Sequence, residues 1–325
     1  MKKLYLILVV VLMMAVTGCS SSGGSVDGHG GSDTADTSDY TSANIGILKY
    51  VPPGAFQRDS TTGNISSVSA FRMSRYEITR QQFLDIMETD PSNPTYSSGS
   101  MSDPVQQVNW YHAIAFCNKL SIAEGFTRVY DVAGVADNDA WVALSFGSIP
   151  TSDDANWNAA SATWANTGYR LPTEMEWEWA AMGATSDWIS SDIVGGINTG
   201  GYTKTFAGSS GSNAIGAYAV FGARGSDIGR TLTERSDPVG GKLQNELGLY
   251  DMSGNVAEWC WDWSADDYGT GTLTDYRGPA SGTYRIYRGG TWMSNVVDGD
   301  LTVAGRISYG PERQISSLGI RVVRK

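Results

Sequence analysis

The strongest chemical signal in the sequence is the run NELGLYDMSGNVAEWCWDW at residues 245–263. It brings side-chain oxygens from Asp251, Asn255 and Glu258 close together, and Gly254 permits a tight turn among them. Oxygen ligands on an irregular, glycine-containing loop suit a hard cation such as calcium, which accepts carboxylates and backbone carbonyls in flexible geometry. The run therefore predicts either a calcium-binding loop or a polar turn over an aromatic core.

Softer metals have few candidate ligands in this chain. It contains two histidines and three cysteines, and His29 lies in a polar N-terminal stretch. A histidine-rich zinc or iron site in a folded domain is therefore not expected. Cys117 on a predicted helix and Cys260 between two tryptophans are expected to be buried thiols, and the spacing leaves open whether they form a disulfide.

Seven motifs, taken in order, resemble the formylglycine-generating enzyme family, also called sulfatase-modifying factors. They are FRMSRYEIT (71–79), PVQQVNWYHAIAFCN (104–118), GYRLPTEMEWEWAA (168–181), PVG (238–240), the run at 245–263, YRGGTW (287–292) and LGIRVV (318–323). The resemblance covers residues 45–325 as one domain. It implies an α+β fold, the C-type-lectin-like fold of the formylglycine-generating enzyme type, which is loop-rich and low in regular secondary structure.

The family resemblance also implies a cation loop in the central run. Carried over by position, the side chains of Asp251 and Glu258 and the carbonyl oxygens of Gly254 and Val256 would hold a structural calcium ion. Asp251 stands where the family often has an asparagine, and this change keeps an oxygen ligand. Such an ion would bind the folded state only and would therefore stabilise it.

The oxidase members of the family bind copper through two closely spaced cysteines that follow an RGG[ST][FW] strand. Here that strand is RGGTW at 288–292, Ser294 stands at the first cysteine position, and the second position falls near Asp298 or Gly299. Soft thiolates select copper(I), so oxygen side chains are poor replacements. We therefore expect no copper and no copper-dependent oxidase activity.

The C-terminal segment from about residue 286 to 325 also resembles the variable region of proteins diversified by retroelements, such as the Treponema variable protein. In those proteins, template adenines are randomised, so asparagine codons become a scattered set of residues within a constant scaffold. Residues that are reachable from an asparagine codon stand here between the scaffold motifs GGTW, LTVA and LGIRVV. These candidate ligand-binding positions are Ser294, Asn295, Val296, Asp298, Gly299, Gly305, Ile307, Ser308, Tyr309, Gly310, Ile315, Ser316 and Ser317.

The composition of these positions is compatible with a binding face. Tyr, Ser, Asn and Gly are the residues with which antibody loops make adaptable hydrogen bonds around a few anchors. Tyr309 and Ile307 would be such anchors here. The other interpretation is that these residues are ordinary loop surface in a degenerate relative of the enzymes.

The N-terminus predicts export and a lipid anchor. Lys2 and Lys3 precede an apolar run at 4–16, which is typical of a signal peptide over residues 1–18. The following VTGC resembles a bacterial lipobox, so Cys19 is expected to carry acyl chains that anchor the protein to a membrane. Residues 19–44 are rich in Ser, Gly and Asp and are expected to be a flexible tether. These features predict a lipid-anchored protein of the bacterial cell envelope, at the outer-membrane surface.

Three helices are expected to position the motifs. Thr79 with Gln82 forms a capping-box pattern, a second helix spans 109–124, and Thr173 with Glu176 begins a third. Short strands are expected before them, and long loops over 131–167.

In the third helix, the alternate glutamates at 174, 176 and 178 could indicate acid–base chemistry. We interpret them as structural, because acidic residues near a helix start interact favourably with the helix dipole. Met175, Trp179 and Ala180 are expected to face inward and Trp177 to cover an adjacent loop.

The first functional hypothesis is a non-catalytic surface lipoprotein that binds an unknown protein or glycan ligand through its C-terminal positions. The formal charge of −11 argues against nucleic acid as a partner, since phosphate binding needs clustered Lys and Arg. One alternative is an enzymatic or accessory relative of the formylglycine-generating enzymes. Another is a carbohydrate-binding or structural envelope protein.

Overall fold

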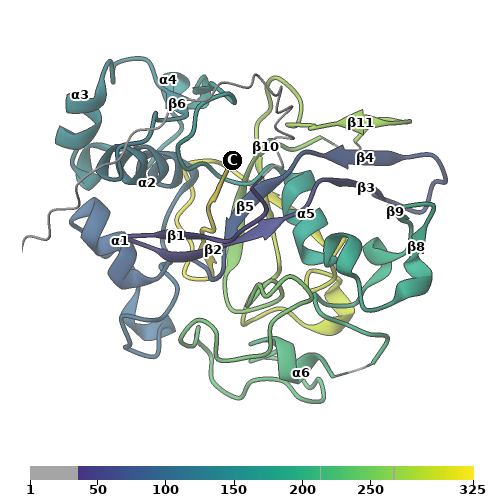
Figure 1. The fold of residues 1–325 in the computed structure, drawn as a ribbon. Coiled ribbons are helices and arrows are strands. Elements are labelled where there is room, and N and C mark those ends of the chain that lie inside the picture. The colour runs from purple at the N-terminus through teal and green to yellow at the C-terminus, as the bar shows by residue number, and fades with distance from the viewer. Residues whose placement is uncertain (1–35, 213, 266–267) are drawn as a thin grey trace, which may run out of the picture. The chain divides into compact units, whose positions relative to one another are not determined.

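The computed structural model describes residues 36–212, 214–265 and 268–325 (Figure 1). The predicted signal peptide, Cys19 and the tether up to residue 35 lie outside these ranges. The folded chain is one compact unit, Thr37–Lys325. Within the described ranges, no helix combines the length and the apolar character that crossing a membrane requires.

Short strands form most of the regular structure. They are β1 (Tyr40–Ser42), β2 (Gly46–Val51), β3 (Gly54–Gln57), β4 (Ile65–Val68), β5 (Phe71–Ser74), β6 (Tyr130–Asp131), β7 (Ser161–Ala162), β8 (Ile193–Val194), β9 (Ile197–Asn198), β10 (Ala257–Trp263), β11 (Leu273–Thr274), β12 (Arg285–Arg288), β13 (Arg306–Tyr309), β14 (Leu318–Gly319) and β15 (Val323–Arg324). They assemble in the orders β1-β2-β5-β15, β13-β12-β10-β14 and β11-β4-β3-β9-β8, with a two-stranded ribbon of β6 and β7.

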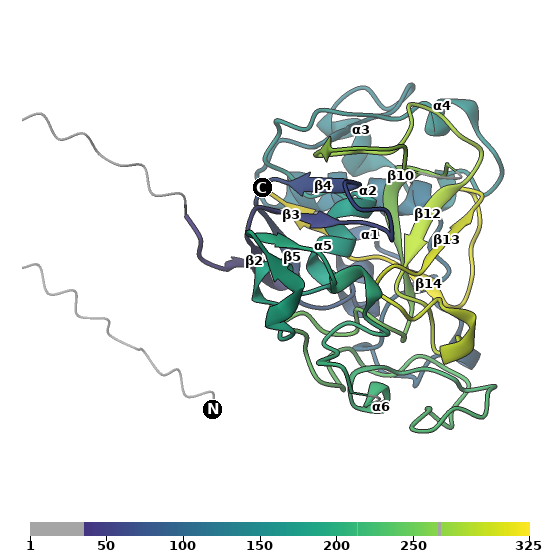
Figure 2. The same ribbon diagram turned by 90° about the vertical axis from the view of Figure 1, so that its right-hand side faces the viewer.

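The sheet around β10 carries the C-terminal segment. β10 pairs antiparallel with β12 and parallel with β14, and β12 pairs with β13 so that Tyr287 stands opposite Ile307. Figure 2 shows β12, β13 and β14 together along one side of the molecule. The last strand, β15, instead joins β5 in the first sheet, with Val323 opposite Met73. The C-terminal segment therefore ends inside the scaffold, which restrains it at both ends.

Helices cover the sheets. They are α1 (Arg80–Met87), α2 (Trp110–Ala123), α3 (Asn138–Ala143), α4 (Ala155–Asn158), α5 (Glu174–Ala181) and α6 (Ile215–Tyr218), with a short 3-10 helix, η6, at Val296–Asp298. Helices α1 to α4 gather on one side, and α6 lies apart from them (Figure 1).

The three predicted helix starts are confirmed. The Thr79 hydroxyl accepts from the Gln82 N–H, and the Gln82 side chain accepts from the Thr79 N–H. Thr173 and Glu176 make the same reciprocal pair at α5, and Asn109 caps α2. These local patterns satisfy backbone N–H groups that the first helical turn leaves unpaired.

Large aromatic side chains fill the core. Six tryptophans are among the largest fully buried side chains, namely Trp110, Trp141, Trp177, Trp179, Trp259 and Trp292. Several indole N–H groups find backbone acceptors, as when Trp259 Nε1 donates to Val108 O at 2.9 Å. The indole N–H groups of Trp141 and Trp292 have no hydrogen-bond partner among the described residues. Each ring nevertheless buries much apolar area, which stabilises a fold with little regular structure.

The structure corrects three sequence predictions. The folded part begins before residue 45, because β1 joins the first sheet and the Ser42 hydroxyl donates to Glu124. Residues 131–167 are not only loops, since α3, α4 and the ribbon anchor them through the buried Trp141 and Trp157. Trp177 does not cover a loop but is fully buried.

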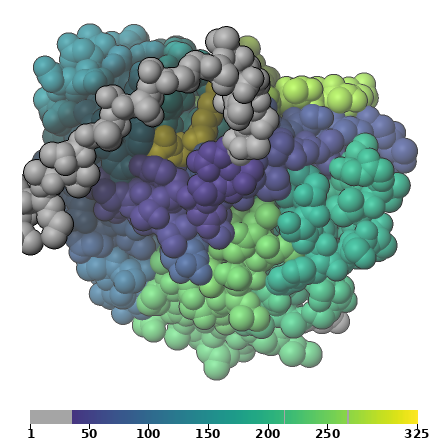
Figure 3. Space-filling model, in the orientation of Figure 1, coloured from purple at the N-terminus to yellow at the C-terminus, as the bar shows by residue number. Residues whose placement is uncertain are grey.

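The space-filling view distinguishes the faces of the molecule. In Figure 3 the purple N-terminal strands form the front, with segments from the central part of the chain below and beside them. The C-terminal segment reaches this face only as a narrow yellow strip.

Candidate functional site

Helix α5 places two glutamates against the strands that begin the C-terminal segment. Arg288 Nε lies 2.9 Å from Glu174 Oε1, and Arg288 Nη2 lies 2.7 Å from Glu178 Oε2. Arg306 Nε, on β13, lies 2.8 Å from the same Glu174 oxygen. Burial raises the pKa of Glu178 to about 7 although Arg288 opposes the shift. The glutamates of α5 therefore serve structure through arginine pairs, in addition to the helix dipole that the sequence suggested.

A second buried ion pair holds the centre of the sheet. Arg321 Nε donates to both oxygens of Glu258 at 2.9 and 3.0 Å, and Trp177 Nε1 donates to Glu258 Oε2 at 2.7 Å. Arg321 also donates to Ser74 O and Tyr250 O. A guanidinium thus already neutralises the Glu258 carboxylate, one of the four predicted calcium ligands.

The other predicted ligands surround this pair. Asp251 Oδ2 accepts from the Gly240 N–H at 2.7 Å, while the buried Oδ1 has no hydrogen-bond partner among the described residues. Gly254 donates its N–H to Gly289 O, and Val256 donates its N–H to Glu77. The unpaired Asp251 oxygen fits a cation, whereas the engaged Glu258 fits one poorly.

Glu77 is a buried carboxylate that sequence reasoning missed. It accepts from Asn255 Nδ2 at 2.7 Å and from the Val256 N–H at 3.0 Å. Burial and the nearby Asp251 and Glu258 raise its pKa well above the ordinary value, and burial raises the pKa of Asp251 to about 6. Across the described ranges, no group of three or more His, Cys, Asp or Glu side chains is arranged to hold a metal ion. Calcium at this loop stays a prediction.

The C-terminal segment folds around a cavity of about 360 Å³, which we call the C-terminal pocket. Five of the thirteen candidate binding positions line it, and they come from three separate stretches of the segment. These five are Ser294, Asp298, Ile307, Ile315 and Ser317. The pocket is also lined by Tyr287, Thr291, Met293, Asp300 and Leu318. The tertiary structure therefore brings together side chains that are scattered in the sequence.

Carboxylates and hydroxyls give the C-terminal pocket its polarity. Burial and the neighbouring Asp298 raise the pKa of Asp300, although a hydrogen bond from Ser294 opposes the shift. Burial, with the negative charge of Asp300, raises the pKa of Tyr287 to about 12, so this phenol stays protonated at neutral pH. The Ser294 hydroxyl also accepts from the Thr291 N–H at 3.1 Å. The pocket is thus lined by hydrogen-bonding groups as well as by aliphatic side chains.

Val296, a sixth candidate position, lies in a neighbouring cavity that we call the apolar hollow. This hollow has a volume of about 390 Å³ and is lined partly by Phe206, Ile215 and Ile228. Asp227 orients η6 by accepting from the Val296 N–H at 2.9 Å. Since η6 contributes Val296 to the apolar hollow and Asp298 to the C-terminal pocket, we refer to the two cavities together as the C-terminal face.

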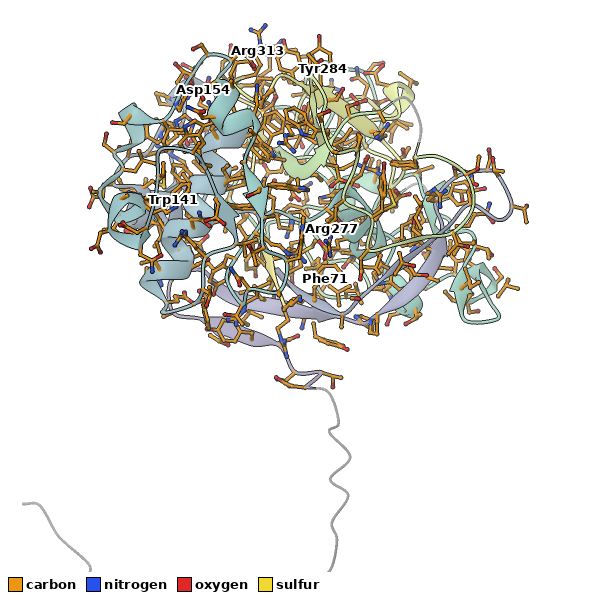
Figure 4. The ribbon with its side chains drawn as sticks, turned by 90° about the horizontal axis from the view of Figure 1, so that it is seen from above. Phe71, Trp141, Asp154, Arg277, Tyr284 and Arg313 are labelled. Carbon is orange, nitrogen blue, oxygen red and sulfur yellow. The ribbon has the colours of Figure 1, made fainter. Side chains whose placement is uncertain are left out.

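Other candidate positions lie near the pocket without lining it. Asn295 Nδ2 donates to Asp298 at 3.0 Å, and Gly299 has a left-handed backbone with φ of 78°. Tyr309 is 39% exposed, with the Arg313 guanidinium 5.2 Å from its ring centroid. Figure 4 shows Arg313 at the same margin of the molecule as Tyr284, the residue that precedes β12. The remaining such positions are Ser308 opposite Ile286, Gly310 near Glu312, and Ser316.

Gly305 is a poor candidate for a variable binding position. A Cβ at this site would lie 2.6 Å from Gly299 O and 2.7 Å from Asp300 O, and both are backbone atoms that cannot turn aside. Arg288 Nη1 also donates to Gly305 O at 2.9 Å. Close backbone packing therefore requires glycine here, which the codon pattern could not reveal.

Residues 38–325 match the model of the sulfatase-modifying factor enzyme 1-like domain. The chain belongs to this family. The expected family and α+β fold are therefore confirmed. The expected loop-rich architecture is also confirmed, since the helices and strands are short.

Individual members of the family, and proteins related to it, are similar over most of their length. The chain is 28% identical over 337 residues to the chaperone protein LppX of Paenibacillus barcinonensis, covering 100% of this chain and 99% of that protein. It is 30% identical over 297 residues to the formylglycine-generating enzyme of Thermomonospora curvata, covering 83% and 87%. Among solved structures, Treponema denticola variable protein 1 matches with a TM-score of 0.73 at 32% identity, covering 88% of this chain and 98% of that one.

The positions that match the family's two copper-binding cysteines carry oxygen in this member. The resemblance places the first cysteine position at Ser294 and the second near Asp298 or Gly299, and Ser294 and Asp298 both line the C-terminal pocket. Cys117 and Cys260 are free and buried, and burial raises both thiol pKa values. Neither thiol lines the pocket.

Sequence reasoning missed several pocket residues, above all Tyr287 and Asp300. Tyr287 belongs to the family motif YRGGTW, and its register opposite Ile307 turns it to the same face of the sheet. Alternation along the two strands could have indicated this, because residues directly opposite each other point the same way. Asp300 is followed directly by the scaffold motif LTVA, and no local pattern marks it.

Proposed function

We propose that this protein is a non-catalytic, lipid-anchored binding protein of the bacterial cell envelope that recognises protein or glycan ligands through its C-terminal face. The observation that carries the proposal is the C-terminal pocket, in which five candidate variable positions from three stretches of chain meet around one cavity. Recognition commonly resides on loops that a rigid scaffold positions.

The scaffold beneath the face is suited to tolerate changes in the lining. Arg288 and Glu174 are each no more than 1% exposed in their side chains, and Glu174 joins β12 to β13 through Arg288 and Arg306. Ser294, Asp298 and Ile307 line the cavity and take no part in these ion pairs. Substitutions at pocket positions would therefore alter the ligand-binding surface with little effect on the fold, which is the property that a diversified face needs.

The absence of cysteine from the matching positions supports a non-catalytic role. A serine hydroxyl and an aspartate carboxylate at residues 294 and 298 do not provide the soft ligands that copper(I) selects. The alternative, an enzymatic or accessory relative of the formylglycine-generating enzymes, would need another site.

The membrane anchor in the proposal rests on the N-terminal sequence. Cys19 follows a signal-peptide pattern in the lipobox-like VTGC, and the similarity to LppX extends over this N-terminal stretch. Acylation at Cys19, with a short tether before β1, would hold the domain near an envelope membrane, with the outer-membrane surface as the proposed location.

A second candidate function is chaperone-type binding of apolar segments, which the full-length similarity to LppX favours. The apolar hollow is bordered by Ile228, which is 95% exposed, and it lies next to Val297, which is 86% exposed. Exposed aliphatic groups around a hollow suit apolar side chains of another protein.

The experiment that tests the proposal is affinity selection from a displayed random-peptide library, run in parallel with a glycan array. The full-length chain is compared with the Ile307→Ala/Tyr309→Ala double variant and with a Val142→Ala control, which changes an exposed aliphatic residue on α3. We expect selected ligands to lose at least tenfold in affinity for the double variant and to bind the control unchanged. Equal binding to all three proteins would contradict the proposal, and binding on the glycan array alone would favour the carbohydrate-binding alternative.

A further inference from the structure

The charged side chains that line the C-terminal pocket all carry the same sign. Asp298 and Asp300 contribute carboxylates, and none of the described residues that line the pocket is a lysine, arginine or histidine. Among the described residues that line this cavity, the charged groups are therefore all negative.

Ser317 adds an unused polar group to the same cavity. Its side chain is 4% exposed and lines the pocket, and its hydroxyl makes no hydrogen bond to any other residue in the described ranges. The oxygen is not sealed from solvent, so a ligand that donates or accepts a hydrogen bond here would take the place of solvent at this hydroxyl.

Apolar side chains form the rest of the wall. Ile307 from β13 and Ile315 from the following loop both line the pocket. Long basic side chains bury their aliphatic stems against such surfaces while the charged end reaches polar groups. Aliphatic and acidic walls in one cavity therefore match a cationic group at the end of an apolar stem.

The electrostatics of the two carboxylates support the same ligand. Burial and the charge of Asp298 raise the pKa of Asp300, which shows that two like charges lie close together in a partly desolvated place. A cation would relieve this repulsion through charge-assisted hydrogen bonds. The chain as a whole has a formal charge of −11, which also favours a cationic ligand.

We propose that the C-terminal pocket binds a basic side chain, lysine or arginine, presented by a protein ligand, with its stem against Ile307 and Ile315 and its charged end at Asp298 and Asp300. This inference rests on the proposed function and deepens it by naming the chemistry of the ligand. A free polyamine offers the same chemistry, so the test includes one.

The test uses the full-length chain in detergent and four fluorescent peptides of one sequence. Their central residue is lysine, arginine, Nε-acetyl-lysine or glutamate, and affinity is measured by anisotropy. We expect the lysine and arginine peptides to bind at least tenfold more tightly than the acetyl-lysine peptide, which keeps the stem and lacks the charge. Spermidine competes in a separate arm. Displacement of the peptides only at concentrations far above their own dissociation constants supports a protein ligand, and displacement at or below those constants overturns that part of the proposal.

Variants place the binding in the pocket. Asp298→Asn and Asp300→Asn should each weaken the lysine peptide about tenfold, whereas Asp139→Asn, the same charge change on α3, should have no effect. Unchanged thermal unfolding of each variant shows that folding is intact. Equal affinity for the lysine and acetyl-lysine peptides overturns the basic-ligand proposal. If neither charged peptide binds while library-selected ligands still depend on Ile307 and Tyr309, this inference fails and the proposed function stands.

Discussion

Arg288 Nη2 lies 2.7 Å from Glu178 Oε2, although the two residues are 110 positions apart in the sequence. The pair is fully buried and joins α5 to β12, the strand from which the C-terminal segment departs. Arg288 also reaches Glu174, which in turn contacts Arg306. The candidate binding face is therefore built on a buried network of charges. Removing one partner would leave another charge buried without compensation.

Removing the central arginine should destabilise the fold strongly. The Arg288→Met variant leaves the buried Glu178 without its cation and Glu174 with Arg306 alone, and breaking a buried pair typically costs about 3 to 5 kcal/mol. We expect a loss of that order in the free energy of unfolding measured with urea. The control is Arg224→Met, which removes a solvent-exposed pair with Glu234 and should leave the stability nearly unchanged. Equal, small losses for the two variants would show that the network is not stabilising.

His112 should make stability depend on pH between about 4 and 6.5. Burial lowers its pKa from 6.5 to about 4, so between these values the unfolded chain binds a proton that the folded chain does not. The stabilisation is complete above pH 6.5 and is lost as the pH falls towards 4, by about 1.4 kcal/mol for each pH unit. His112→Gln keeps a capping-box residue after Asn109 and should lose less stability than wild type between pH 7 and pH 4.5. If urea unfolding shows that the two proteins lose the same free energy of unfolding between pH 7 and pH 4.5, the assignment is wrong.

Calcium should raise the thermal unfolding temperature if the loop binds it as predicted. Asp251 carries the unpaired buried oxygen, and its pKa of about 6 means that calcium competes with a proton at this site. The rise in unfolding temperature should therefore be larger at pH 8 than at pH 5. At a free calcium concentration one hundred times the dissociation constant, the stabilisation corresponds to about 2.7 kcal/mol. Asp251→Asn should reduce it, whereas Asp85→Asn on α1 should not. The absence of any shift at pH 8 would mean that Arg321 alone neutralises this loop.

Sequencing the 3′ end of the gene across many cells and isolates tests diversification directly. We expect substitutions at the codons of Ser294, Asp298, Ile307, Ile315 and Ser317, because their side chains line one pocket. The codon of Gly305 should stay constant, because a Cβ there would strike two backbone oxygens. A uniform sequence would leave a fixed binder, and frequent changes at Gly305 would contradict the packing argument.

Copper-dependent oxidation of a cysteine peptide should not occur. The expected outcome is an unmodified peptide, by mass spectrometry, after incubation with the full-length chain and copper(I). The formylglycine-generating enzyme of Thermomonospora curvata serves as the positive control. Formation of formylglycine by this chain would refute the non-catalytic proposal, since Ser294 and Asp298 offer no thiolate.

Local sequence patterns predicted the starts of α1, α2 and α5, but not β1, α3 or α4. Thr79, Asn109 and Thr173 cap their helices as expected, because a cap depends only on residues within one turn. The ordered motifs likewise indicated the family, since they follow one another along the chain. The same reasoning reached the C-terminal segment as a candidate binding region.

Only the tertiary structure decided which of those candidates act together. Strand register places Tyr287 opposite Ile307. The buried Arg321 pairs with the carboxylate of Glu258, which the loop pattern predicted as a calcium ligand. Backbone packing excluded a side chain at Gly305. These outcomes depend on contacts between residues that are distant in sequence, and burial gives those contacts their energy. No local pattern encodes which distant partner a buried charge will meet.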